Sequence, residues 1–91
     1  MLIVVAYDVP DDRRRTRIAD MLKDFGIRVQ WSVFECLLED TDIARLRFQL
    51  GTLINASEDS IRIYRVCASC EEALQTLGIA GRTEDPNVFV L

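Results

Sequence analysis

The first apolar run of the chain predicts a β-strand with two apolar faces. Residues 2–8, LIVVAYD, are rich in branched side chains and are bounded by Asp8 and Pro10. Alternation along a strand gives Asp8 three neighbours on its own face, Leu2, Val4 and Ala6. The opposite face carries Ile3, Val5 and Tyr7. Because both faces are apolar, helices on one side leave the other side in need of a second layer, which a second protomer could supply.

A helix over about residues 12–25 follows this strand. Its apolar positions recur at helical spacing, at Ile18, Met21, Leu22 and Phe25. Asp11 or Asp12 can cap the first turn, because an aspartate there accepts hydrogen bonds from free backbone amides. Gly26 fits the C-terminal stop of the helix.

The rest of the chain continues this succession of strands and helices. Residues 28–39, RVQWSVFECLLE, alternate like a strand, and a bend near Glu35 and Cys36 is expected to divide or kink it. A second helix follows, with Thr41 or Asp42 as its cap, and runs to about residue 55. The remaining predicted elements are a strand over 59–66, a short helix over 70–77, a loop over 78–85 and a last strand over 86–91.

The order of these elements predicts the fold class. The succession β-α-β-β-α-β is that of the ferredoxin-like split βαβ arrangement. We therefore predict an α+β, ferredoxin-like βαββαβ sandwich with an extra C-terminal strand. Such a fold leaves one sheet face without helices, and homodimerisation through that face or through the terminal strand is the expected remedy. Residues 1–91 then form a single domain, in which the loop and strand of residues 79–91 serve dimerisation.

Composition favours one small cytoplasmic domain. The 91 residues are 49% hydrophobic, which suffices for one core. No apolar run approaches the roughly 20 residues that span a bilayer, and the N-terminus lacks the features of a signal peptide. Three cysteines are an odd number, unlike the framework of a secreted disulfide scaffold. We expect a soluble protein with reduced thiols and no membrane contact.

The distribution of charge leaves a nucleic-acid partner open. The net charge of -4 argues against such a partner, but binding depends on where the charge lies. A cluster near the N-terminus comprises Arg13, Arg14, Arg15 and Arg17. Arginine binds phosphate bidentately and stays charged, so this cluster could hold a phosphodiester. The alternative is a solvated helix face in which Arg13 and Arg17 pair with acids such as Asp20.

Asp8 is the leading candidate for chemistry. The chain has no histidine, which excludes His-based acid/base catalysis, Ser-His-Asp triads and His-ligated metals. A strand-end aspartate often only caps a turn. If the face of Asp8 meets a twofold-related copy, however, two carboxylates approach, which is unfavourable unless one takes a proton or a cation lies between them. Mg²⁺, held by carboxylates and waters, would satisfy that need and could act on a phosphodiester.

The segment CASC, Cys67 to Cys70, invites a zinc or a redox interpretation. A structural zinc needs four ligands, and besides this pair the chain offers only Cys36. A redox dithiol would open a helix after a strand, a context that is partly met here. Ordinary thiols are the simpler interpretation. Aromatic residues at strand positions, Trp31, Phe34 and Tyr64, could stack on bases but are more typical of cores and interfaces.

Two motifs carry a resemblance to a known family. YDV lies ahead of DDRRR, and QWSVFE follows FGIRV, with DSIRIYRV further along. Together, in this order and at these spacings, residues 1–66 resemble the small CRISPR-associated endonuclease family that partners the CRISPR integrase during spacer acquisition. CASC and the acidic segment RTEDP match no motif of that family.

The resemblance implies a ferredoxin-like homodimer with one Mg²⁺ between the two copies of Asp8. It also implies cleavage of phosphodiester bonds, in single-stranded RNA for some members and double-stranded DNA for others. Positions tied to activity or substrate contact are Tyr7, Arg15, Arg17, Arg28 and Phe34, with Ser32 near the site. The last strand typically clasps the partner protomer.

Two other functions remain open at this point. Members of the same family also serve as non-catalytic bridges between the integrase and incoming DNA, and the net charge of -4 departs from the more basic members. An unrelated ferredoxin-like dimeric binding module is the remaining alternative. The motif order argues against this last function, but the sequence does not separate the first two.

Overall fold

The computed structural model of the protein describes residues 1–73, 83–85 and 88–89. Its elements are β1 (Leu2–Asp8), α1 (Asp12–Leu22), β2 (Ile27–Gln30), β3 (Val33–Leu37), α2 (Asp40–Leu53), β4 (Ser60–Val66), α3 (Ala68–Glu72), β5 (Thr83–Asp85) and β6 (Val88–Phe89). The predicted helix over 70–77 and last strand over 86–91 lie partly outside the described residues.

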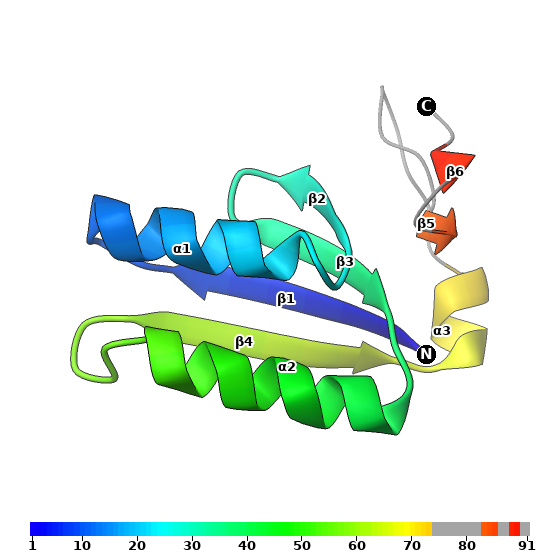
Figure 1. The fold of residues 1–91 in the computed structure, drawn as a ribbon. Helices are drawn as coiled ribbons and strands as arrows, with labels where there is room; N and C mark the ends of the chain where they lie inside the picture. Colours follow the sequence, from blue (N-terminus) through cyan, green and yellow to red (C-terminus); the bar gives the residue numbers. More distant parts are fainter. Residues whose placement is uncertain (74–82, 86–87, 90–91) are drawn as a thin grey trace.

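Four strands form one antiparallel sheet in the order β2-β3-β1-β4. β1 is a central strand, whereas β2 and β4 form the edges. α1 connects β1 to β2, α2 connects β3 to β4, and both helices lie along the same face of the sheet (Figure 1). This arrangement confirms the predicted ferredoxin-like α+β fold. β5 and β6 form a separate antiparallel pair.

The core lies between the sheet and the two long helices. Its fully buried side chains include Ile3, Val5 and Phe34 from the sheet, Ile18 and Leu22 from α1, and Leu46 from α2. The opposite face of β1 and β3 carries Val4, Ala6, Val33 and Leu37, which are only half-buried. The prediction of a first strand with two apolar faces is therefore confirmed: helices cover one face, and the other face, which we call the open face, is not covered by α1 or α2.

α1 begins at the predicted place and ends earlier than predicted. Asp11 is its N-cap, and the Asp11 side chain accepts a hydrogen bond from the Arg14 amide at 2.8 Å. The helix ends at Leu22, because the Phe25 amide bonds to the Leu22 carbonyl three residues back and tightens the last turn. Phe25 nevertheless remains buried in the core.

The predicted bend near Glu35 and Cys36 is wrong. The turn lies instead at residues 31–32, between β2 and β3, which pair as an antiparallel hairpin. Cys36 is fully buried and continues the alternation of β3, so the strand runs straight through it. The irregularity in this hairpin is a register shift between Arg28 and Gln30.

The N-cap of α2 lies two or three residues ahead of the predicted caps, Thr41 or Asp42. Glu39 is its extended N-cap and makes no side-chain cap bond, so Thr41 and Asp42 lie inside the first turn. Asp40 and Asp42 suit that turn because negative charge is stabilising near a helix N-terminus. Among the helices of the described residues, none is both long and apolar enough to cross a bilayer.

The C-terminal elements also differ from prediction. α3 begins at Ala68, two residues ahead of the predicted start. Residues 83–85 form β5, where the sequence predicts a loop, because they pair with β6. The short polar segment TED has no strand-like alternation of its own, so only this pairing makes it a strand.

Gly26 allows the end of α1 to pack closely on β3. A Cβ atom at this position would lie 2.2 Å from the Glu35 carbonyl oxygen and 2.8 Å from the Cys36 Cα. Backbone atoms cannot give way as a flexible side chain can. The glycine is therefore required by this close approach as well as being suited to the end of a helix.

Gly26→Ala is expected to lower the free energy of unfolding by about 1–3 kcal/mol, the usual cost of overpacking. Urea denaturation followed by circular dichroism measures the change. Gly51→Ala is the matched control, because Gly51 is exposed on α2 and a Cβ there meets no atom within 4 Å. This control should be neutral or stabilising by up to about 1 kcal/mol. Equal effects of the two substitutions would refute the close-approach argument.

Candidate active site

Asp8 is the last residue of β1 and lies exposed at the end of the open face. In the ladder between β1 and β4 it stands opposite Ser60, the first residue of β4. The two residues border a hollow of about 260 Å³, lined by Ala6, Tyr7, Asp8, Ser60 and Arg62. The carboxylate is thus presented to solvent at a strand end, as the sequence predicts, and is not consumed by capping α1, whose cap is Asp11.

Arg62 is a neighbour of Asp8 that sequence reasoning missed. It pairs with Ala6 in the ladder and therefore lies on the open face, diagonally across from Asp8. A hydrogen bond with Tyr64 raises the pKa of Arg62, which secures its positive charge. The signal was available in the alternation of β4, but only the register of β4 on β1 assigns Arg62 to the face of Asp8.

Tyr7 points away from Asp8, into the helix-covered side of the sheet. It is 5% exposed, and its hydroxyl donates a hydrogen bond to the Trp31 carbonyl oxygen at 3.3 Å. Its amide donates to the Ser32 carbonyl oxygen at 3.1 Å. Tyr7 and Ser32 therefore tie the β2–β3 turn to the end of β1. The Tyr7 side chain lies on the face of β1 opposite to that of Asp8.

Arg28 stacks on two aromatic rings in the same region. Its guanidinium carbon lies 5.6 Å from the centroid of Trp31 and 5.3 Å from that of Phe34. Phe34 itself is fully buried, whereas Trp31 is 75% exposed. A hollow of about 170 Å³ opens here between α1 and the hairpin, lined by Tyr7, Arg15, Thr16, Ala19, Asp20, Lys23, Arg28 and Trp31. The structure thus brings Tyr7, Arg15 and Arg28 together, on the opposite side of β1 from Asp8.

Arg15 holds the loop that follows Asp8. Its Nη1 donates to the Val9 carbonyl oxygen at 2.8 Å and contacts the Pro10 carbonyl oxygen at 3.5 Å. Its Nη2 pairs with Asp12. These contacts fix the backbone that leaves β1 after Asp8.

Arg17 lies on the outer side of α1. Arg13 and Arg17 are both exposed and border one shallow surface hollow. Within the described part of the chain neither forms an ion pair; Asp20, the partner that a solvated helix face would suggest, pairs with Lys23 at 3.4 Å. These two guanidinium groups are therefore available to an external anion, although they are not gathered around Asp8.

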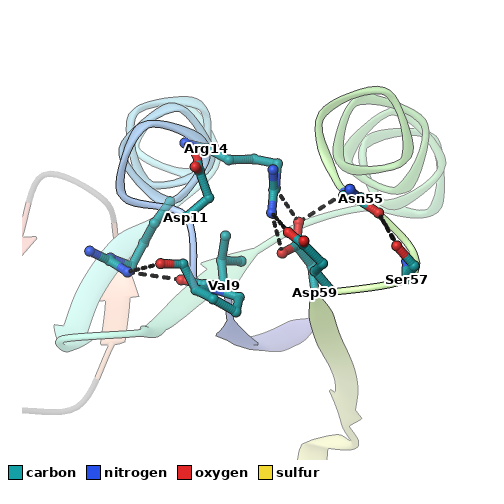
Figure 2. Close-up of polar contacts among 9 residues, drawn as sticks. Val9, Asp11, Arg14, Asn55, Ser57 and Asp59 are labelled. Atoms are coloured by element: carbon teal, nitrogen blue, oxygen red, sulfur yellow. Dashed lines mark hydrogen bonds and ion pairs between the residues drawn. The ribbon is translucent and has the colours of Figure 1, made fainter.

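Arg14 ties α1 to the loop before β4. Figure 2 shows its side chain reaching from α1 to Asp59. Arg14 Nε donates to Asp59 Oδ2 at 2.5 Å, and Arg14 Nη2 donates to Asp59 Oδ1 at 2.9 Å. Nη2 also donates to Glu58 Oε2 at 2.9 Å. The Asp59 side chain is completely covered and accepts a further hydrogen bond from the Asn55 amide at 2.8 Å. Asp59 directly precedes Ser60, so this network fixes the strand that borders Asp8.

The hydrogen bond from Arg14 is also the main electrostatic perturbation at this end of the molecule. It lowers the pKa of Asp59 against the opposing effect of burial, with a smaller contribution from the Asn55 amide. Arg14 is thus occupied by a bidentate contact with a carboxylate and is not free to hold a phosphate.

The residues around Asp8 suit a hard cation. One protomer supplies a single carboxylate here, and the described residues contain no group of three or more His, Cys, Asp or Glu side chains that could hold a metal ion. Mg²⁺ in proteins commonly keeps several waters and takes only one or two carboxylates. Asp8, an exposed carboxylate, therefore fits one ligand position of such a site.

Fold and site together define a ferredoxin-like α+β protein with an exposed carboxylate and a neighbouring arginine on the open face of its sheet. The family described as "CRISPR associated protein Cas2" matches residues 1–73. The chain belongs to this family, which confirms the resemblance noted in the sequence motifs.

Curated relatives match the chain over nearly its full length. A protein of Synechocystis sp. is 49% identical over 90 residues, covers 99% of this chain and 98% of the relative, and is named CRISPR-associated endoribonuclease Cas2 3. A protein of Thermus thermophilus is 42% identical over 90 residues, covers 99% of this chain and 96% of the relative, and is named CRISPR-associated endonuclease Cas2 2.

Solved structures show the same fold. Cas2 of Streptococcus pyogenes superposes with a TM-score of 0.75 at 32% identity, covering 86% of this chain and 100% of that one. A chain from a partial Cas6-RT-Cas1–Cas2 complex superposes with a TM-score of 0.72 at 28% identity, covering 84% and 89%. The second match shows this fold in an assembly that includes Cas1.

Asp59→Asn is expected to remove part of the loss of folding stability that the native chain shows as pH falls. Because the folded-state pKa of Asp59 is depressed, its ionisation stabilises the fold above the unfolded aspartate pKa of about 3.9, and this stabilisation is lost as pH falls toward the folded-state pKa. Urea midpoints measured from pH 7 to pH 2 should fall less steeply for the variant, which starts from a lower value at pH 7. Asp20→Asn, in an exposed pair, is the control and should leave the profile unchanged. Parallel curves for Asp59→Asn and the native chain would contradict this account.

Proposed function

We propose that the protein is a CRISPR adaptation endonuclease that hydrolyses phosphodiester bonds in single-stranded RNA, double-stranded DNA or both. The observation that carries this proposal is the position of Asp8, an exposed carboxylate beside Arg62 on the open face of the sheet. The names of the two curated relatives, an endoribonuclease and an endonuclease, support hydrolysis over a purely bridging role.

Homodimerisation through the open face is part of the proposal. The open face of β1 and β3 carries four half-buried apolar side chains, Val4, Ala6, Val33 and Leu37, beside the half-buried Glu35, and these apolar side chains would otherwise remain in water. A twofold axis crossing this face would bring the two Asp8 side chains toward each other from the ends of the two β1 strands. Each protomer would then contribute one carboxylate to a shared Mg²⁺ site, which neither completes alone.

Each side chain has a distinct task in the proposed reaction. When bound, Mg²⁺ supplies a Lewis acid that stabilises negative charge building on the phosphoryl oxygens. Asp8 holds the ion through its side-chain oxygen atoms. Arg62 donates to a non-bridging phosphate oxygen from the same face, and this interaction strengthens as charge develops in the transition state. Arg15 acts as a positioning residue, since it holds the loop after Asp8 through the Val9 carbonyl.

Binding of the longer nucleic acid would use the remaining exposed cations. Arg17, with Arg13, offers free guanidinium groups on the outer side of α1, and Arg28 presents its guanidinium beside the exposed Trp31. Tyr7, Ser32 and Phe34 support Arg28 and the turn rather than contact substrate, because Tyr7 and Phe34 are buried. The occurrence of the same fold in an assembly with Cas1 supports a CRISPR integrase as a partner of this chain.

Asp8→Asn is expected to reduce Mg²⁺-dependent cleavage on the order of 10²-fold or more, because the amide cannot supply the charge that holds the ion. Labelled single-stranded RNA and double-stranded DNA, incubated with the purified full chain, give the rates and the substrate preference. Calorimetric titration with Mg²⁺ is an independent readout and should show weaker binding by the variant.

Asp24→Asn is the matched control, since Asp24 is exposed at the far end of α1. It should cleave and bind Mg²⁺ as the native chain does, and light scattering should show the same oligomer for all three proteins. Full activity in Asp8→Asn would mean that the cleavage comes from a contaminant and would overturn the proposal.

Arg62→Ala is expected to lower kcat/KM about 10- to 100-fold, the range for losing a hydrogen bond to a charged group. Arg62→Lys should recover part of this loss, because a lysine keeps the charge but not the bidentate contact. Arg65→Ala is the control on the same strand: its register places it opposite Ile3, on the other face. If Arg62→Ala and Arg65→Ala had the same effect, Arg62 would not act at the Asp8 site.

A further inference from the structure

The two exposed thiols of the CASC segment lie together at the start of α3. Cys67 is the N-cap residue, in extended backbone, and Cys70 lies in the first turn. Residues three apart along a helical turn are neighbours, so Cys67 and Cys70 lie on the same side of the first turn of α3. The Cys67 Sγ is also 3.3 Å from the Ser69 Oγ. The proposed nuclease site makes no use of this cluster.

The contacts make the two thiols chemically unequal. Hydrogen bonding with Ser69, and to a smaller extent with Cys70, lowers the pKa of Cys67 to about 7. The interaction with Cys67 raises the pKa of Cys70. Cys67 therefore carries more thiolate at neutral pH than an ordinary cysteine, and the thiolate is the nucleophile in disulfide exchange. The third cysteine is different: Cys36 is fully buried, and burial raises its pKa to about 11.

Metal binding explains this pair less well than thiol chemistry does. A structural zinc site needs four ligands, and no cluster of three or more ligating side chains is present in the described residues. Among the described residues, the chain thus presents two exposed thiols one helical turn apart, one of them activated, with no third ligating side chain grouped with them. That arrangement is the one required of an attacking and a resolving thiol.

We propose that Cys67 and Cys70 are a reversible redox site that closes into an intramolecular disulfide by exchange with a low-molecular-weight disulfide such as glutathione disulfide. The Cys67 thiolate attacks one sulfur of the small disulfide, whose S–S bond breaks and releases one small thiolate. Cys70 then gives up its proton and attacks the Cys67 sulfur, releasing the second small thiol. The two cysteines are oxidised together, and the small disulfide is reduced to two thiols. Excess small thiol reverses both steps.

The position of the site gives this reaction a structural consequence. Cys67 directly follows Val66, the last residue of β4, and β4 is an edge strand of the sheet. The disulfide would join the residue that leaves β4 to the first turn of α3. Oxidation would therefore fix the path of the chain where it departs from the sheet edge, without touching Asp8 or Arg62.

Glutathione redox buffers of graded composition test the proposal on the full chain at pH 7 in the presence of EDTA. Intact mass spectrometry should show loss of two hydrogen atoms as the buffer becomes oxidising, with recovery in excess reduced glutathione. Maleimide labelling after each step should fall from two accessible thiols to none. Non-reducing electrophoresis should show no chain-to-chain link.

Single substitutions distinguish the attacking thiol, Cys67, from the resolving thiol, Cys70. Cys70→Ser should stop at a stable glutathione adduct on Cys67, whereas Cys67→Ser should react several-fold more slowly, because Cys70 lacks the activated thiolate. Ser69→Ala keeps both thiols and should shift the pH midpoint of Cys67 alkylation upward. Circular dichroism confirms that these exposed substitutions leave the fold intact. Stable glutathione adducts on the native chain, or disulfides between chains, would overturn the proposal, as would resistance to the oxidised buffer.

Discussion

β1 is hydrogen-bonded on both sides, to β3 and to β4, so its side chains cannot exchange faces without the loss of two ladders. This constraint fixes where each neighbouring side chain goes. Tyr7 enters the helix-covered side and holds the β2–β3 turn, while Asp8, one residue later, emerges on the open face. The same pairing brings Ser60 and Arg62 beside Asp8. The two ladders of β1 thus fix the face on which the Asp8 carboxylate lies.

The end of β1 is held by two arginines of α1 that act on different segments. Arg15 binds the carbonyl groups of the loop after Asp8, and Arg14 binds Asp59 just ahead of β4. The covered Asp59 carboxylate carries hydrogen bonds from both a guanidinium and a backbone amide, as a buried charge requires. The chain after Asp8 and the chain before Ser60 are therefore both fixed from the same helix, so the part of the proposed site that one protomer supplies is held in place before a dimer forms.

Local signals predicted most of the fold. Some helix ends were misplaced by two or three residues, and the larger errors arose where strand pairing decides. Period-two alternation and helical spacing place the four strands of the main sheet and both long helices, and the face of Asp8 follows from counting along β1. The division of residues 28–39 depends on a hairpin register, and β5 depends on pairing with β6. Arg14 finds a partner 45 residues away, and Arg62 joins the site through a ladder. The residues next to Arg14 and Arg62 in the sequence do not indicate that Arg14 pairs with Asp59 or that Arg62 lies on the face of Asp8.

The four arginines near the N-terminus make different contacts and therefore do not act as one anion-binding patch. A cluster of four guanidinium groups looks like one phosphate-binding patch, yet Arg14 and Arg15 are already bound within the fold. The exposed positive charge is thus smaller than the sequence indicates, in a chain whose net charge is -4. Strong binding of a polyanion by one protomer is not expected from such a surface. In the proposed dimer the number of exposed arginines would double, and a cation held by the two Asp8 side chains would add its charge at the axis. Affinity and chemistry would then both depend on the pairing of the two open faces.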